Sequence, residues 1–491
     1  MWMREKIWNE ATPAERRLAG LAVNPAAPDR LLLRILAEGP PAARMALCGD
    51  RDLSVPVVDA LVSHSDPRAR AVFASSPHAD PVQRARLVDD PEWLVRAHLA
   101  EGPSRRLVTW PRPLPDEVVV HMFTTYENEL LGNLYRQTSP GLRRRMPTHP
   151  EAKVRRAGVG NWSALSAHVR AALLADPDPG VREGASSYVR NEDPSWVERE
   201  LPDHSCHART HLLMHCALSR AVIDSVLTAP AGKEDRAMIA HNPSLPPDVV
   251  VLLAGDNDPH VRETIAGRTD LGSSERAALA VDPDPEVRLT LSVHPALTES
   301  ERAAIDYTVP EGGDFGPQPA WPRDPAVVRL NALSGHPLLR RRAAADHNLP
   351  PDLVALLAAD ADHGVRVTLA QNHPDAPAAL LLGSFLEYTG HHRADLLTRP
   401  HFPTVGLAAH AEHEDPAVRA LVARDPEADP ELVERLTRDP DPAVRAALTR
   451  HPNLPAARLA ELLGDEELAP HAAANPALDP ALMEELVETT C

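Results

Sequence analysis

Apolar residues return at helical spacing in short segments of the chain, and prolines separate these segments. The stretch 439–463, DPDPAVRAALTRHPNLPAARLAELL, shows the pattern. Asp441 is a residue type that caps helices, Pro442 suits the first helical position, and Val444 and Leu448 lie four residues apart on one helical face. A proline ends this helix, and a second run of leucines at helical spacing follows. The pattern predicts two short helices joined by a turn, a helical hairpin.

The hairpin is one copy of a unit that returns every 26 or 27 residues, and an arginine marks most copies. These slot arginines are Arg44, Arg70, Arg96, Arg155, Arg182, Arg209, Arg236, Arg262, Arg288, Arg340, Arg366, Arg393, Arg419 and Arg445. Two steps break the period: 52 residues after Arg288, which fits two units, and 59 residues after Arg96, which fits two units with a short insertion. A fixed period of this length is typical of a solenoid. The sequence therefore predicts an all-α solenoid of about 17–18 helical-hairpin repeats of 26–27 residues.

The arginine column favours a structural role over a row of ligand-binding cations. An aspartate stands four residues before many slot arginines, as Asp284 does before Arg288. We expect it to cap the helix and to pair with that arginine or with its equivalent one repeat away. One period outward, Leu18 and Ala469 occupy the slot. Because terminal repeats lack a neighbour on one side, we expect them to depart from the pattern.

Units that read DPxxVRxxLAxxP and then LPxxLLxxLL resemble the leucine-rich repeat variant family of bacterial proteins, a relative of HEAT and armadillo arrays, over about four fifths of the chain. The resemblance implies a right-handed α-solenoid in which an α-helix alternates with a shorter helix that can be 3₁₀. A described member carries a cysteine-rich iron–sulfur module. Cys48, Cys206, Cys216 and Cys491 are scattered here, so we expect no cluster and no other cofactor. The family implies no reaction.

Composition and charge narrow the possible partners. The formal net charge is −19, which argues against nonspecific binding to nucleic acid or to anionic membranes. The sign is uneven: residues 101–190 carry a net +4 and residues 411–491 a net −11. The N-terminal residues hold no apolar stretch long enough for a signal peptide or a membrane span, so we expect a cytoplasmic protein. We predict one continuous solenoid with the parts 1–103, 104–150, 151–305, 306–325 and 326–491.

The first break in the pattern, residues 104–150, mixes arginines with aromatic residues. Such a mixture can bind an acidic or phosphate-rich partner, although a degenerate repeat with solvated arginines is the favoured interpretation. The candidate partner-binding residues here and just after it are Arg105, Arg106, Trp110, Arg143, Arg144, Arg145, Arg155 and Arg156.

The second break, 306–325, is rich in glycine and proline and holds the candidate contact residues Phe315 and Trp321. A disordered spacer and a contact loop both fit, and the aromatic residues favour contact.

A third departure is the segment from His204 to Cys216, where His207, His211 and His215 fall four residues apart. Imidazoles at that spacing can share one helix face and bind zinc with a thiolate. The repeat register places His215 level with His294, an ordinary position, so we expect no metal site.

The common catalytic motifs are absent from the sequence, which gives no indication of an enzyme. We therefore expect a noncatalytic scaffold or adaptor that binds protein partners on its extended surface. One alternative is a nucleic-acid-binding or processing protein similar to the HEAT-like DNA glycosylases, for which the basic residues within 101–190 would grip a duplex. A metal-binding accessory protein that uses the His/Cys segment is the other.

Overall fold

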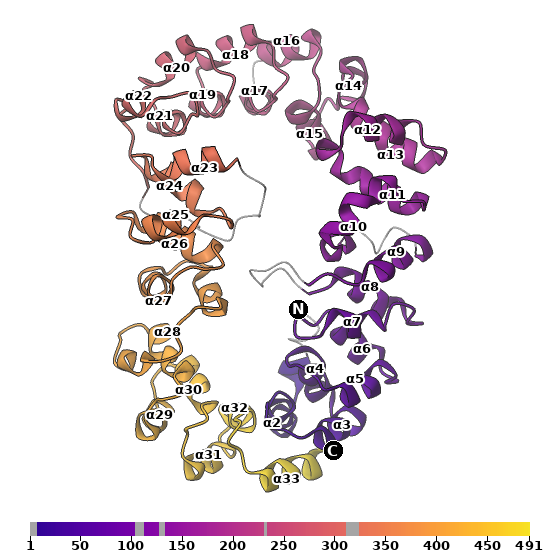
Figure 1. Ribbon diagram of the computed structural model, residues 1–491, viewed down its shortest axis with the longest axis vertical. Helices are drawn as coiled ribbons and strands as arrows, with labels where there is room; N and C mark the ends of the chain where they lie inside the picture. Colours follow the sequence, from indigo (N-terminus) through magenta and orange to yellow (C-terminus); the bar gives the residue numbers. More distant parts are fainter. Residues whose placement is uncertain (1–6, 104–111, 127–132, 230–232, 311–323) are drawn as a thin grey trace. The chain divides into compact units, whose positions relative to one another are not determined.

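A computed structural model describes residues 7–103, 112–126, 133–229, 233–310 and 324–491 of the chain. The chain divides into two compact units, unit 1 with residues 1–158 and 403–491, and unit 2 with residues 159–402. Within the described residues every regular element is a helix, and neighbouring helices pack on one another (Figure 1). The all-α repeat fold predicted from the period is confirmed. The five-part division of the solenoid stays a prediction.

Unit 1 contains α2 (Pro13–Ala22), α3 (Asp29–Glu38), α4 (Pro41–Gly49), α5 (Val55–Val62), α6 (Pro67–Ala74), α7 (Pro81–Ala85), α8 (Trp93–Glu101), α9 (Asp116–Thr125), η2 (Leu134–Gln137), α10 (Pro140–Arg145), η3 (Met146–Thr148), α11 (Ala152–Gly158), η6 (Leu407–His410), α28 (Pro416–Arg419), η7 (Ala420–Arg424), α29 (Pro430–Leu436), α30 (Pro442–Thr449), α31 (Ala456–Leu462), α32 (Ala469–Ala473) and α33 (Pro480–Thr490).

Unit 2 contains η4 (Val159–Ala164), α12 (Ala167–Leu174), α13 (Pro179–Arg190), α14 (Pro194–Glu200), α15 (His207–His215), α16 (Arg220–Thr228), α17 (Lys233–Ala240), α18 (Pro247–Ala254), α19 (Pro259–Ala266), α20 (Ser273–Leu279), α21 (Pro285–Ser292), α22 (Glu299–Ala303), α23 (Pro325–Ala332), α24 (Pro337–Ala344), α25 (Pro351–Ala358), α26 (His363–Asn372), α27 (Ala378–Glu387) and η5 (Arg393–Thr398).

The predicted capping of the repeat is confirmed in α30. The carboxylate of Asp441 accepts the backbone N–H groups of Ala443 and Val444 at 2.8 and 3.3 Å, and Pro442 is the first helical residue. Val444 and Leu448 are fully buried. The helix ends at Thr449, and the second helix, α31, follows after a turn. Prolines therefore mark the helix boundaries.

Most repeats have a first helix, which carries the slot arginine, and a second helix, and the two kinds pack differently. The first helices α17, α19 and α21 pack side by side, and the second helix α18 packs mainly on the first helix of the following repeat, α19. The second helices α18 and α25 are α-helices of 8 residues, as long as the first helices α17 and α24 that precede them. In these repeats the second helix is thus not the shorter 3₁₀ helix that the family resemblance allows.

A ladder of ion pairs connects successive first helices. In Arg262, Nε donates to Asp282 Oδ2 at 2.8 Å and Nη2 donates to Oδ1 at 2.9 Å, and the two side chains are only 13% and 6% exposed. The Nη1 atom of Arg262 also donates to the backbone oxygen of Asp256 at 2.7 Å, and the Asp256 carboxylate accepts from Arg236 of the preceding repeat. Each such aspartate therefore joins two arginines. The same pairing occurs in Arg70–Asp90, Arg236–Asp256, Arg340–Asp360 and Arg419–Asp439.

The ladder was predicted, but its aspartates are not usually the capping ones. Asp258 caps α19 through the N–H of His260, whereas Asp256, two residues earlier, makes the ion pair. Arg44 does pair with a capping aspartate of the next repeat, Asp66, at 3.6 Å. The prediction thus identified the ladder and assigned the wrong aspartate to most of the pairs named above.

A second polar ladder is formed by the residue six positions after the slot residue, at the end of the first helix. The buried Asn242 side chain donates to the backbone oxygens of Leu213 and Cys216 in the preceding repeat at 2.9 and 2.7 Å, and its Oδ1 accepts the N–H of Ser244. Asn475 makes the equivalent bonds to the preceding repeat. These side chains satisfy carbonyl groups at helix ends that would otherwise be buried without partners.

Within unit 1 the first and last repeats pack on each other as successive repeats do. Helix α2 packs on α32, and the Cβ that an alanine would add at Gly20 would lie 1.9 Å from the carbonyl oxygen of Pro470. The slot residues of the two terminal repeats, Leu18 and Ala469, are buried, at 0% and 4% exposure. The expectation that the terminal repeats depart from the pattern because they lack a neighbour is therefore wrong. These two repeats differ from the pattern at the slot position, where they pack on one another.

One of the two irregular steps between slot arginines keeps the polar contacts of the regular repeats. In the 59-residue step, the buried Gln137 donates to the backbone oxygens of Leu99 and Ala100 at 2.6 and 2.9 Å, as a second-ladder side chain does. In the 52-residue step, α23 is a second helix, and no first helix precedes it among residues 304–310 and 324. Residues 311–323 of that step lie outside the described part of the chain.

Candidate interaction surfaces

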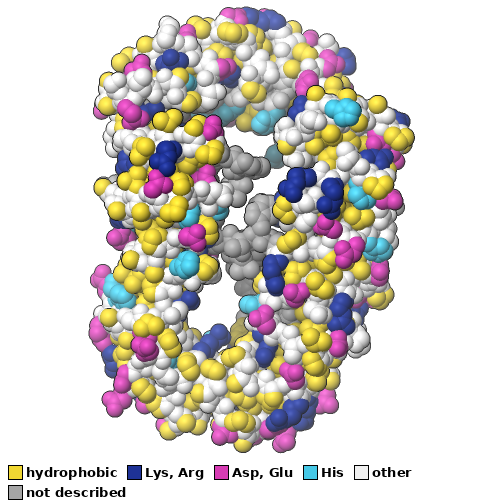
Figure 2. Space-filling view, in the orientation of Figure 1, with side chains coloured by type: hydrophobic (Ala, Val, Ile, Leu, Met, Phe, Trp, Pro, Cys, Tyr) yellow, Lys and Arg dark blue, Asp and Glu magenta, His cyan; other side chains and the backbone are white. Residues whose placement is uncertain are grey.

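The basic segment predicted as a binding site lies in unit 1. Residues 133–158 hold seven Arg and Lys residues and one acidic residue, Glu151. Ser139 caps α10 by accepting the N–H of Leu142 at 3.0 Å, which places Arg143, Arg144 and Arg145 in the last turn. Figure 2 shows Lys and Arg side chains gathered over α10. Local sequence thus concentrates positive charge on two neighbouring short helices, α10 and α11.

The arginines of this segment differ in whether they already bond to other groups of the protein. Arg155 donates to the backbone oxygens of His149 and Pro150 at 2.9 and 2.7 Å, the arrangement of a slot arginine. Arg145 pairs with Asp116 at 2.8 Å. Arg144 and Arg156 are exposed. The charge offered to a partner is therefore carried mainly by Arg144, Arg156 and the exposed Arg145.

The aromatic residues of the segment make contacts inside the protein. The guanidinium of Arg96 lies 4.8 Å from the ring centre of Tyr126, and the Tyr126 hydroxyl donates to Asp89 at 2.9 Å. Arg143 lies 5.5 Å from the ring centre of Tyr135. Tyr126 and Tyr135 are therefore occupied by cation–π contacts. The other candidates, Arg105, Arg106, Trp110, Phe315 and Trp321, lie outside the described residues.

The histidines of the His/Cys segment do share a helix, α15. The rings of His211 and His215 are 5.3 Å apart, and both side chains are exposed. Cys216 is buried, and burial raises the pKa of its thiol, which disfavours the thiolate that binds metals. Across the described residues, no group of three or more His, Cys, Asp or Glu side chains is arranged to hold a metal ion.

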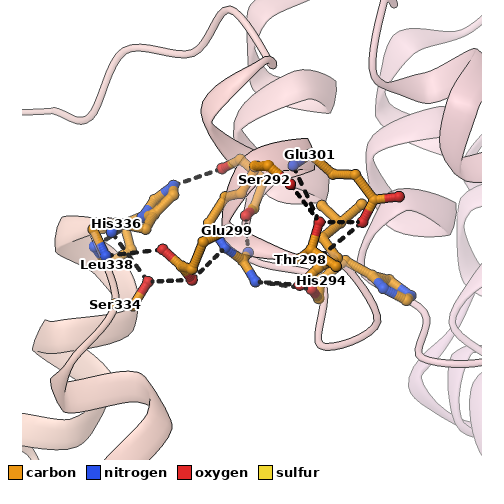
Figure 3. Close-up of polar contacts among 12 residues, drawn as sticks. Ser292, His294, Thr298, Glu299, Glu301, Ser334, His336 and Leu338 are labelled. Atoms are coloured by element: carbon orange, nitrogen blue, oxygen red, sulfur yellow. Dashed lines mark hydrogen bonds and ion pairs between the residues drawn. The ribbon is translucent and has the colours of Figure 1, made fainter.

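A buried polar cluster that sequence reasoning missed lies in unit 2 between α21 and α24 (Figure 3). His336, the N-cap of α24, places Nε2 2.7 Å from the hydroxyl of Ser292, and the ring of Tyr307 stacks on the imidazole at 4.4 Å. The His336 Nδ1 accepts the backbone N–H of Leu338, so the neutral ring carries its proton on Nε2 and donates it to Ser292. The Ser292 hydroxyl in turn donates to the backbone oxygen of Leu289 at 2.6 Å.

This tautomer excludes the serine–histidine chemistry that the pair suggests. A general base must accept the hydroxyl proton, whereas here Nε2 donates to that hydroxyl. Burial, with help from the nearby guanidinium of Arg302, lowers the pKa of His336 to about 4, so the ring stays neutral at pH 7. Glu299 completes the cluster by accepting from the Ser334 hydroxyl and the Gly335 N–H, each at 2.9 Å. The cluster joins the repeats on either side of the 52-residue step.

The clearest unused surface is a row of apolar side chains on five consecutive second helices of unit 2. The row occupies the sixth residue after each N-cap, and its members are 26 residues apart. They are Leu252, Ala278, Ala304, Leu330 and Leu356, which we call the apolar row. The three leucines are exposed by 58%, 71% and 46%, in that order. The 26-residue spacing of these apolar residues is the sequence signal for this surface, whereas the slot arginines mark a face that the ion-pair ladder largely buries.

In unit 1 the sixth residue after the N-cap of a second helix is mostly charged or polar. The residues at this position are Arg34, Ala60, Arg86, His121, Arg145, Arg435, Glu461 and Glu485. The apolar row is therefore not a requirement of the repeat fold, since other repeats of the same protein form without it.

Further exposed apolar side chains broaden the row at individual repeats. Val251 is 54% exposed beside Leu252, and Val327 and Leu333 are 50% and 62% exposed on either side of Leu330. Exposed apolar side chains that group on a surface mark interaction sites in many proteins.

Comparison with known proteins does not assign this chain to a family. No protein-family profile matches it, and no curated protein matches it. Among solved structures, the crystal structure of an engineered protein aligns with 98% of this chain and 100% of its own chain, with 14% identity and a TM-score of 0.11. A likeness at that score carries no argument about fold or function. No helix among the described residues is both long and apolar enough to cross a membrane.

Proposed function

We propose that this protein is a noncatalytic scaffold that binds a protein partner on the outer face of its second helices. The observation that carries the proposal is the apolar row, in which five consecutive repeats expose an apolar side chain at one position. Exposing three leucines to water is unfavourable unless a partner covers them. The polar side chains of the two ladders and of the Ser292–His336 cluster bond to other groups of the protein and so stabilise the fold. This supports the proposal indirectly, because it leaves the exposed apolar residues as the candidate binding surface.

The repeat units also support membership in the leucine-rich repeat variant family. Asp258, Pro259 and Arg262 play the structural parts that the DPxxVR pattern needs: cap, first helical residue and ladder cation. The four cysteines are free thiols, as in a reducing cytoplasm, which is the location we propose.

Site-specific cross-linking in the producing cell tests the proposal. A photoreactive amino acid replaces Leu330 in the apolar row, and in a matched variant it replaces Arg435, which is exposed at the same position of a unit 1 repeat. We expect a discrete protein adduct from position 330 and none of the same mass from position 435. Identical adducts from both positions, or nucleic acid as the only adduct from position 330, would contradict the proposal.

A further inference from the structure

We propose that His211 and His215 on α15 bind a zinc ion, and that water completes the coordination of the metal. The described residues contain no group of three or more side chains arranged to hold a metal, and this site uses two side chains and no thiolate. Helix α15 carries the slot arginine Arg209 and is a first helix. The site therefore lies apart from the apolar row and does not depend on the proposed function.

The separation of the two imidazole rings suits tetrahedral coordination. Zinc binds an imidazole nitrogen at about 2.0–2.1 Å, which places the centre of the ring about 3.2 Å from the metal. Two rings at the tetrahedral angle then have centres about 5.2 Å apart, and two rings at a right angle have centres about 4.5 Å apart. The ring centres of His211 and His215 are 5.3 Å apart. The observed separation therefore matches the tetrahedral arrangement that zinc prefers.

The position of the pair on the helix also suits a cation. Residues four apart lie on one face of an α-helix, one turn above the other, and His215 is the last residue of α15. A bound ion would thus lie near the C-terminal end of the helix, where the helix dipole favours positive charge. Both side chains are exposed, so an ion reaches them from solvent. Within the described part of the chain neither imidazole forms a hydrogen bond, so binding would break none.

His215 does not have the role of the histidines at the same repeat position. His294 and His451, each six residues after its slot arginine, are buried, and their Nδ1 atoms accept the backbone N–H two residues later at 3.1 and 3.0 Å. His215 stands in the same register but is exposed, and the buried residue of this repeat is Cys216. The register, from which we expect no metal site, therefore does not account for the imidazole of His215.

Zinc at this pair would hold two successive turns of α15 together. The N-cap residue Cys206 makes no capping hydrogen bond with its side chain, and the buried residues of the helix are Leu212 and Leu213. Helix α15 thus begins without the side-chain cap that most first helices have. A metal that binds the folded pair and not the unfolded chain stabilises the folded state. We therefore expect zinc to raise the stability of the protein.

Zinc titration of the full-length protein, purified without a histidine tag, tests the inference. Calorimetry measures the binding of zinc chloride, with magnesium chloride as the control ion, because magnesium prefers oxygen ligands. The variants are His211→Gln, His215→Gln and the shifted variant Ala208→His/His211→Gln. The shifted variant keeps the number of histidines but places two of them at positions 208 and 215, about 10.5 Å apart along the helix and too far apart for one ion. Ala208 is exposed and glutamine favours helix more than histidine does, so all three should fold.

We expect zinc to bind the wild type and magnesium not to bind. Each of the three variants should weaken zinc binding by at least about tenfold, because a two-ligand site loses one of its imidazoles. The matched control His204→Gln/His260→Gln removes two other exposed histidines and should change the binding by less than about twofold. Zinc should raise the unfolding temperature of the wild type and of the control, but not that of His211→Gln.

No zinc binding by the wild type, or equal binding of magnesium, would overturn the inference. Unchanged zinc binding by any of the three variants would also overturn it, because surface histidines would then bind the ion without the pair. X-ray absorption at the zinc edge gives an independent check. Two imidazole ligands with oxygen in the remaining positions would support the site, whereas a sulfur ligand at about 2.3 Å would assign the ion to a cysteine and overturn the inference.

Discussion

Asn24 binds Asn475 as one repeat binds the next: its Nδ2 donates to the backbone oxygen of Asn475 at 2.6 Å and to that of Ala473 at 2.9 Å. Asn475 makes the same pair of bonds to Thr449 and His451, at 2.8 Å each. The second ladder therefore passes from the last repeat to the first without a change in geometry. The ends of this chain are held together by the interaction that holds its repeats together.

This contact predicts that residues near the N-terminus stabilise the C-terminal repeats. Gly20→Ala should lower the free energy of unfolding by about 1–3 kcal/mol, because the added Cβ would meet the Pro470 carbonyl and force the two repeats apart. Gly184→Ala is the matched control. Its Cβ meets nothing within 4 Å in α13, so it should be neutral or stabilise by up to about 1 kcal/mol. Urea unfolding measures both, and equal effects would show that the packing of α2 on α32 contributes little.

Loss of a ladder arginine should cost stability. Arg262→Gln removes the cation that the buried Asp282 carboxylate accepts from, so we expect a loss of about 1–3 kcal/mol. Arg220→Gln, which breaks a pair with 58% and 61% exposed side chains, should cost less than about 1 kcal/mol. Thermal unfolding compares the two variants. If both cost the same small amount, the ladder is not a source of stability.

The buried histidine predicts a pH dependence of stability. Burial lowers the pKa of His336 from an ordinary 6.5 to about 4, so between these values the unfolded chain binds a proton that the folded chain does not. Stability from this residue is fully present above pH 6.5 and declines as the pH falls toward 4. His336→Asn keeps a capping side chain but cannot titrate. Its stability should fall less than that of the wild type over this window in urea unfolding, and parallel curves would contradict the assignment.

The basic segment allows a direct test of the nucleic-acid alternative. Duplex DNA is titrated into the wild type and into Arg143→Glu/Arg144→Glu/Arg145→Glu at about 50 and 150 mM salt. We expect no tight binding at the higher salt, because the chain carries a net charge of −19 and Arg143 and Arg145 already contact Tyr135 and Asp116. Submicromolar binding at about 150 mM salt that the triple variant abolishes would favour a nucleic-acid-binding protein over the scaffold.

The repeat fold was largely readable from the sequence because its capping aspartates, prolines and slot arginines act locally and recur at one period. Asp441 and Pro442 define the start of α30 without reference to any other repeat. The partner of a slot arginine was less predictable, since Asp256 and Asp258 are both near a helix start and only packing decides which one meets Arg236.

Features that depend on distant residues could not be predicted in this way. Ser292 and His336 are 44 residues apart and come from two repeats, so no local pattern in the sequence brings them together. The contact of Gly20 with Pro470 joins opposite ends of the chain. For the candidate surfaces, sequence reasoning located the cations of α10 and α11 but not the cation–π contacts that occupy Tyr126 and Tyr135.

The most direct test of the account separates architecture from binding in one experiment. The photoreactive amino acid is placed at position 356 in three backgrounds, wild type, Leu330→Glu and Arg262→Gln, and both the adduct yield and the thermal unfolding are measured. We expect Leu330→Glu to abolish the partner adduct at an unchanged unfolding temperature, because Leu330 is 71% exposed. Arg262→Gln should lower the unfolding temperature and keep the adduct. The opposite outcome, in which Leu330→Glu unfolds the protein or Arg262→Gln abolishes the adduct without loss of stability, would show that the surface and the ladder have been assigned the wrong roles.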